Sequence, residues 1–179
     1  MIRVWREDDT RIRQGDIFRD IVHLERFTQE EDFIEVSQIL FPLVIVLTQD
    51  CDLEQDKNNR GKEKQDKKLV SILVAPLYNA DQVFRGEHLS DIELLMEPIP
   101  GERKNFVVKN QNPRYYYLEF PEECRITPSV IDFKHYFSLS LDVLEESYGD
   151  SFICCISELF RERISQRFSN YLARIALPD

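Results

Sequence analysis

The chain contains little glycine and no long hydrophobic run. Only five of its 179 residues are Gly, and no G-x-G-x-x-G or Walker-type spacing occurs, which argues against a Gly-rich phosphate loop. No stretch approaches the ~20 consecutive apolar residues of a membrane-spanning helix. The first nine residues carry charges in place of the apolar segment of a secretory signal. We therefore expect a cytoplasmic protein with no membrane segment.

Cysteine is scarce, and its spacing does not suit a structural metal site. The four Cys are at positions 51, 124, 154 and 155, so two are adjacent and no C-x2-C pair exists. In a reducing compartment all four should be thiols. The sequence predicts no metal site and no cofactor.

Positive charge is also in short supply. The chain has 23 Lys and Arg against 33 Asp and Glu, a formal net charge of −10, which disfavours general binding to nucleic acid. What the chain does contain is apolar and aromatic: 42% of the residues are hydrophobic, with twelve Phe and seven Tyr. This composition indicates a folded chain of one domain, or one domain with an appendage.

Hydrophobic periodicity predicts mostly short strands. Residues 41–47 form an apolar run long enough for one buried strand, and it ends in the polar cluster of residues 48–52. Further strands are expected at 17–24, 33–37, 69–77, 105–109, 114–120, 130–133 and 136–141. The charged residues 54–68 should form a loop.

Two segments have helical spacing of their apolar residues. The first covers residues 79–96, and the second begins at a Ser157 cap and ends near Pro178. The expected fold is therefore mostly β (α+β): a small SH3-like β-barrel with an inserted helix and a C-terminal amphipathic helix. We divide it into a barrel at 1–150, containing the helix at about 79–96, and a helix at 151–179 that packs on the barrel or on a partner.

The order of these segments resembles the MazF/PemK/CcdB-type toxins, a family of SH3-like barrels. The similar motifs are residues 13–17 (R-Q-G-D-I), 41–48, 73–77 and 129–132, and the resemblance spans about residues 11–144. The family implies RNA cleavage, for which an Arg before the strand proline and a Thr or Ser after the later proline are implicated. This chain has Phe41 at the first position and Leu77-Tyr78 at the second. The resemblance therefore implies the barrel and not the activity.

The polar cluster at the end of the central strand supplies the main candidates for catalysis. They are Asp50, Cys51 and Asp52, together with His135, which lies next to a turn. The two flanking carboxylates disfavour a Cys51 thiolate, so a buried structural thiol is the alternative. Asp50 and Asp52 could hold Mg²⁺ with Asp16, but capping of loop backbone donors is the favoured interpretation. His88, on the apolar face of its helix, should be a packed residue.

Two other groups are candidates for binding. Nucleic acid could contact the basic loop and an aromatic strand, on which only alternate Tyr share a face. These residues are Lys62, Lys64, Lys67, Lys68, Arg114, Tyr115 and Tyr117. A partner protein could contact the polar face of the C-terminal helix through Arg163, Arg167 and Arg174.

The leading functional prediction is a cytoplasmic binding or partner module of a bacterial toxin–antitoxin or phage-defence system, with a protein partner or a homo-oligomer. The alternative is a nuclease that cuts RNA with a set of residues different from the family's.

Overall fold

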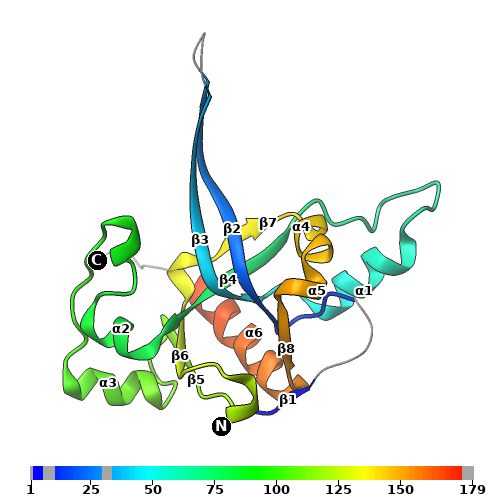
Figure 1. Ribbon diagram of the computed structural model, residues 1–179. Coiled ribbons are helices and arrows are strands. Elements are labelled where there is room, and N and C mark those ends of the chain that lie inside the picture. Colours follow the sequence, from blue (N-terminus) through cyan, green and yellow to red (C-terminus); the bar gives the residue numbers. More distant parts are fainter. Residues whose placement is uncertain (1, 6–10, 30–33, 175–179) are drawn as a thin grey trace.

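A computed structural model describes residues 2–5, 11–29 and 34–174 (Figure 1). The strands are β1 (Val4–Trp5), β2 (Asp16–Gln29), β3 (Ile34–Val46), β4 (Ile72–Asn79), β5 (Tyr115–Leu118), β6 (Ser129–Asp132), β7 (Phe137–Leu139) and β8 (Phe152–Ile156). The helices are α1 (Asp50–Asn59), α2 (Ala80–Arg85), α3 (Gly101–Val108), α4 (Leu141–Glu146), α5 (Tyr148–Ser151) and α6 (Glu158–Leu172). Three short 3-10 helices are η1 (Ser90–Ile92), η2 (Glu122–Cys124) and η3 (Phe133–His135).

The fold is α+β, built on one curled antiparallel sheet. Seven strands follow the order β1-β8-β2-β3-β4-β6-β5, and β7 pairs with β4 outside this path. The sheet curls into a half-barrel around α6 (Figure 1). Each helix of the described residues is too short or too polar to cross a membrane.

Both faces of the sheet are covered at residues 44–47, which explains the second half of the apolar run. Its first half, residues 41–43, lies at the base of the arm and is partly or fully exposed. Val44 and Val46 on β3 pack with Leu53 of α1 and with α4 and α5. Ile45 faces the opposite way and packs in the core that includes α6. A strand that is buried on both faces has no position for a polar residue.

Helix α6 is the predicted amphipathic helix, and it begins directly after Ser157. Ile164 and Phe168 are buried in the main core against the concave face of the sheet. The prediction extended this helix toward Pro178, but residues 175–179 lie outside the described part of the chain.

A third apolar cluster joins α2 and α3 to β6, and two expectations fail here. The helix predicted at 79–96 ends at Arg85, because Gly86 adopts φ +77° and reverses the chain. A Cβ at Gly86 would lie 2.1 Å from the Met96 carbonyl oxygen. The strand predicted at 105–109 is instead helix α3, which buries only Val107.

Three other elements also differ from the predictions. Helix α1 occupies the first part of the predicted loop at 54–68 and is anchored by Leu53. The strands expected at 33–37 and 41–47 are one strand, β3; Phe33 itself lies outside the described residues. Strand β8 was not predicted and joins β1 to β2 at one side of the sheet.

Strands β2 and β3 extend well beyond the sheet as a two-stranded arm (Figure 1). β2 pairs with β8 only at Asp16–Phe18, and β3 pairs with β4 only at Val44–Val46. From Ile21↔Phe41 to Gln29↔Ile34 the two strands pair only with each other among the described residues. In the described part of the chain, both outer edges of the arm are therefore unpaired.

Candidate functional site

The turn before β2 closes against β8 at Gly15. Gly15 adopts φ +85°, and a Cβ there would lie 2.6 Å from Cγ1 of Ile156. Its backbone N–H donates to the Val46 carbonyl, and its carbonyl accepts from Ile156 N–H. Only glycine combines this conformation with so close an approach. The R-Q-G-D turn is thus fixed between β3 and β8.

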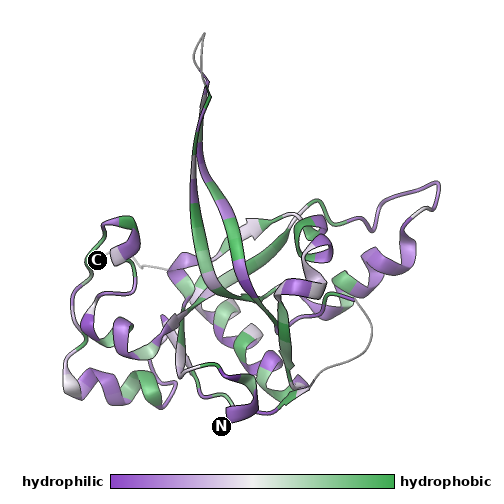
Figure 2. Cartoon of the chain, in the orientation of Figure 1, coloured by the Kyte–Doolittle hydropathy of each residue, from purple (hydrophilic) through white to green (hydrophobic). Residues whose placement is uncertain are grey.

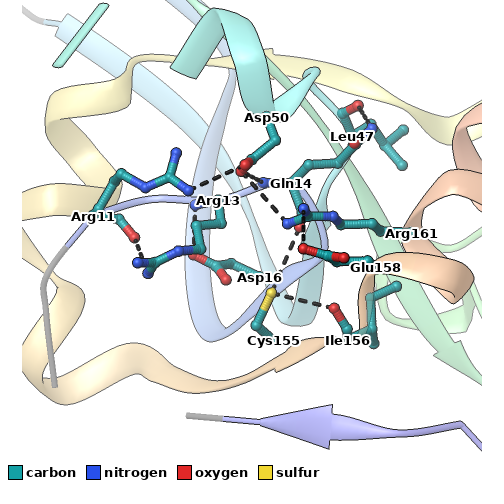
Figure 3. A network of polar contacts seen from close by, with 10 residues as sticks. All are labelled: Arg11, Arg13, Gln14, Asp16, Leu47, Asp50, Cys155, Ile156, Glu158 and Arg161. Atoms are coloured by element: carbon teal, nitrogen blue, oxygen red, sulfur yellow. Dashed lines mark hydrogen bonds and ion pairs between the residues drawn. The ribbon is translucent and has the colours of Figure 1, made fainter. Parts of the chain in front are cut away.

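Asp50, the first predicted catalytic residue, links this turn to α1 and α6 (Figure 3). Its Oδ1 accepts from Gln14 N–H at 3.2 Å, and its Oδ2 accepts from Arg11 Nη2 at 3.1 Å. Arg161 of α6 places Nη1 3.7 Å from Oδ1. The carboxylate also lies in the first turn of α1, where the helix dipole favours negative charge. These contacts give Asp50 a structural role as the point where three segments meet.

The neighbouring candidates lie on the surface. Cys51 is exposed, so the expectation of a buried thiol is wrong. Its Sγ lies 3.9 Å from Oδ1 of Asp52, which is also exposed. Both point outward because they follow Asp50 on the first turn of a helix that buries only Leu53 and Asp56.

A buried acid lies behind the turn. Asp16 is 1% exposed; its Oδ2 accepts from Arg13 N–H at 2.7 Å, and its Oδ1 is buried without a hydrogen-bond partner among the described residues. Burial raises the pKa of Asp16 to about 7, although the Cys155 thiol and Arg13 offset part of the effect. Burial, followed by the charge of Asp16, raises the pKa of the Cys155 thiol. Neither group faces an open cleft.

His135 belongs to a different cluster from Asp50. It lies in η3, and its Nδ1 is 3.7 Å from Oδ2 of Asp132. His88 lies nearby, with ring centroids 6.1 Å apart. His88 occupies the turn after α2 and is half-buried, so its predicted place on a helix face is wrong. The described contacts do not join the predicted Asp50, Cys51, Asp52 and His135 into one site.

The predicted nucleic-acid residues divide between a surface loop and a packed strand. Lys62, Lys64, Lys67 and Lys68 are all exposed on the loop after α1. Arg114 instead pairs with Asp132 through two of its nitrogens and lies over the Tyr115 ring at 4.8 Å. β5 alternates as predicted: Tyr116 is buried in the main core, while Tyr115 and Tyr117 pack beside the third cluster.

The three predicted partner-binding arginines differ in their surroundings. Arg167 donates from Nη2 to the Asn112 carbonyl and is partly buried. Arg163 is exposed beside Phe160, and Arg174 is exposed over the Tyr171 ring, 3.9 Å from its centroid. Of these three, Arg163 on α6 and Arg174, just beyond the end of that helix, are therefore available to a partner.

The arm gathers six of the exposed large apolar side chains of the described residues on one face. Residues directly opposite each other in an antiparallel pair point to the same face. The pairs Val22↔Leu40 and Phe27↔Val36 therefore share a face, on which Leu24 and Ile34 also lie. We call these six residues the apolar face of the arm: Val22, Leu24, Phe27, Ile34, Val36 and Leu40. All six are exposed, with Leu24 at 65% and Phe27 at 63%.

A β-bulge makes this face continuous. Leu24 and Phe27 are three residues apart, so strict alternation would put them on opposite faces. The register shifts between Leu24 and Arg26, which leaves Glu25 as the extra residue and returns Phe27 to the face of Leu24. The other face carries more polar pairs, such as Arg26↔Ser37 and Thr28↔Glu35. The apolar and polar segments alternate along the arm in Figure 2.

Sequence reasoning missed the arm because it split β3 into two strands. Part of the signal was present: two long β-prone segments, each with partial alternation of apolar and polar residues, are joined by an acidic stretch. The His88–Asp132–His135 cluster had no such signal, because His88 lies more than 40 residues before the other two in the sequence.

Comparison with known proteins found no matching family model and no matching curated protein.

Proposed function

We propose that this protein is a binding module that docks a basic protein partner on the apolar face of its β2–β3 arm. The observation that carries the proposal is the gathering of six exposed apolar side chains on one face of an element that projects from the body. Monomeric proteins rarely leave such patches uncovered. A two-stranded ribbon is also marginally stable alone in water, so a partner that covers the ribbon would stabilise it.

Charge favours a basic protein as the occupant. Between residues 19 and 41 the sequence has six acids and two Arg, a net charge of −4, and the whole chain carries −10. A second copy would bring the same charges to the same surface, and like-charge juxtaposition opposes association. Nucleic acid is disfavoured for the same reason, because β-ribbons that bind DNA depend on basic residues. A partner with an apolar groove and a basic rim fits both the face and its edges.

The resemblance to MazF/PemK-type barrels supports a more specific proposal. The curled half-barrel is then a divergent SH3-like barrel, and the protein is a cytoplasmic partner module of a toxin–antitoxin or phage-defence system. Phe41, at the position of the family's implicated Arg, stacks on Phe137 with ring centroids 5.0 Å apart. A packed aromatic ring cannot stabilise a phosphate, so this position supports binding over RNA cleavage. We do not advance the nuclease alternative, because its residues are divided between two clusters.

The test is reconstitution with the products of neighbouring genes. The protein is purified with each one, and complexes are measured by calorimetry and gel filtration. Phe27→Ser combined with Leu24→Ser should weaken the complex by at least ~100-fold, since buried aromatic and apolar anchors dominate interfaces. Thr28→Ala, on the opposite face, is the matched control and should bind normally.

Two results would contradict the proposal. One is a complex that forms equally well with the double variant and with the wild-type protein. The other is a tight homodimer, seen by analytical ultracentrifugation, that Phe27→Ser separates; that result would make a second copy of the chain the occupant.

A further inference from the structure

His88, Asp132 and His135 form a compact cluster between two elements. Asp132 ends β6 and caps η3 by accepting from Lys134 N–H at 3.0 Å, and His135 is the last residue of η3. His88 approaches from the turn after α2. One ligand atom from each of the three side chains lies within 4.8 Å of the others. Ligand atoms around a tetrahedral Zn²⁺ are roughly 3.4 Å apart, so small side-chain rotations would bring these three around one ion.

The imidazole nitrogens in this cluster lack partners. Both ring nitrogens of His88 and Nδ1 of His135 are buried with no hydrogen bond among the described residues. Buried polar atoms are normally paired, and a group that is not paired calls for an explanation. Three such atoms in two neighbouring rings lie beside a carboxylate that is 0% exposed, an arrangement in which one ion could contact all three side chains.

The surroundings suit metal binding by neutral imidazoles. The Tyr78 ring packs edge-on against both rings, at 4.8 Å from His88 and 5.6 Å from His135. Burial lowers the pKa of both histidines, which favours the neutral form that binds metals. His88 also borders a cavity of about 210 Å³ between β3, β4 and α2, which Asp132 and His135 do not line.

We propose that His88, Asp132 and His135 bind a divalent transition-metal ion, with Zn²⁺ the best match to two imidazoles and one carboxylate. Three protein ligands leave a fourth coordination position for a water or a small molecule, as in catalytic zinc sites. None of the three ligands belongs to the arm, although Leu40 of the apolar face lines the same cavity as His88. The metal proposal does not rest on the partner proposed for the arm.

Arg114 has a defined place in such a site. Its guanidinium bonds to both oxygens of Asp132, so it would orient the carboxylate as an outer partner of a ligand. Oδ2 still faces Nδ1 of His135, which is the side from which an ion would be bound. Because its positive charge opposes a cation, we expect weaker binding than three ligands would give without it.

The test uses metal-free full-length protein carrying Cys51→Ser, which removes the exposed thiol as a competing ligand. Zn²⁺ is titrated by calorimetry, and Co²⁺ by its visible d–d absorption, which reports tetrahedral coordination. We expect one ion per chain. His88→Gln and His135→Gln should each weaken Zn²⁺ binding by more than ~100-fold. This is a larger loss than is typical when a residue that only hydrogen-bonds to a metal ligand is removed. His23→Gln, which replaces the one histidine outside the cluster, should leave Zn²⁺ binding unchanged.

Thermal unfolding separates loss of the site from loss of the fold. Zn²⁺ should raise the melting temperature of the parent protein and of His23→Gln, because binding to the native state stabilises it, and should not raise it for the other two variants. The proposal is overturned if the parent protein binds no ion stoichiometrically, or if all three variants bind with the same affinity. Such a result would leave the cluster as two packed rings beside an Arg–Asp pair.

Discussion

Asp16 places a carboxyl group where its neutral form is favoured. Its pKa in the native protein is about 7, whereas an unfolded chain ionises Asp near ~4. Between these values the native state holds a proton that the unfolded state has lost, so stability falls as the pH rises from about 4 to about 7.

Asp16→Asn should remove this dependence. The amide oxygen can still accept from Arg13 N–H, and no charge forms. As the pH rises through that window, the wild type should lose stability relative to the variant. The difference between their unfolding free energies should change by up to about 1.4 kcal/mol per pH unit. Urea unfolding at several pH values measures it, and a flat difference would show that Asp16 ionises normally.

Gly15 gives a second residue-scale prediction. Gly15→Ala requires an unfavourable backbone conformation and a contact of 2.6 Å with Ile156, so it should cost more than ~2 kcal/mol of stability. Gly149→Ala is the matched control, because nothing lies within 4 Å of a Cβ there and Ala favours its helix. Chemical denaturation of both variants compares them, and equal effects would contradict the close packing at Gly15.

At the scale of single elements, α6 is part of the core and not an appendage. Phe168→Ala removes a ring that packs against Phe133 at 5.5 Å and should destabilise the protein by roughly 3–5 kcal/mol. Leu172→Ala, at a half-exposed position of the same helix, should change stability by less than ~1 kcal/mol. Similar losses for both variants would mean that α6 does not pack as described.

The arm should be the least protected part of the sheet. Beyond Ile21↔Phe41 its hydrogen bonds lie in a two-stranded ladder with no third strand, so they should open without global unfolding. Hydrogen–deuterium exchange should be faster in β2 residues 22–29 than in β4. A bound partner should slow it, and slow exchange in the isolated monomer would contradict the two-stranded description.

Elements were predictable where one physical signal dominated. The apolar run in β3, the alternation of β5 and the periodicity of α6 each reflect burial on known faces. Helix α1 was missed because it is mostly solvated and buries only two residues. Helix α3 was mistaken for a strand because its β-branched Val107 and Val108 favour strands locally, while tertiary contacts bury just one of them.

The surroundings of Asp50 and the apolar face of the arm were harder to predict from the sequence than the fold was. Asp50 was expected at the end of a strand, but it begins helix α1 after β3 ends at Val46. Its partners Arg11 and Arg161 are distant in the sequence from it and from each other. The apolar face of the arm depends on a bulge at Glu25. The local sequence does not indicate where the pairing of two strands shifts register.

At the scale of the whole molecule, net charge should control how fast a partner is found. A chain at −10 attracts a basic protein over long distances, and salt screens this attraction. The association rate should fall at least ~10-fold between low and high ionic strength, with a smaller change in the dissociation rate. Stopped-flow mixing measures both, and a rate that rises with salt would point to repulsion between like-charged surfaces.

The apolar face of the arm and the core of the protein are built from different residues. None of the six residues on its apolar face belongs to any of the three core clusters. Substitutions there can change what the protein recognises without lowering the stability of its body. Under the proposed docking role of the arm, recognition and folding are encoded in separate positions, so related chains could acquire new partners along the arm while the same half-barrel is retained.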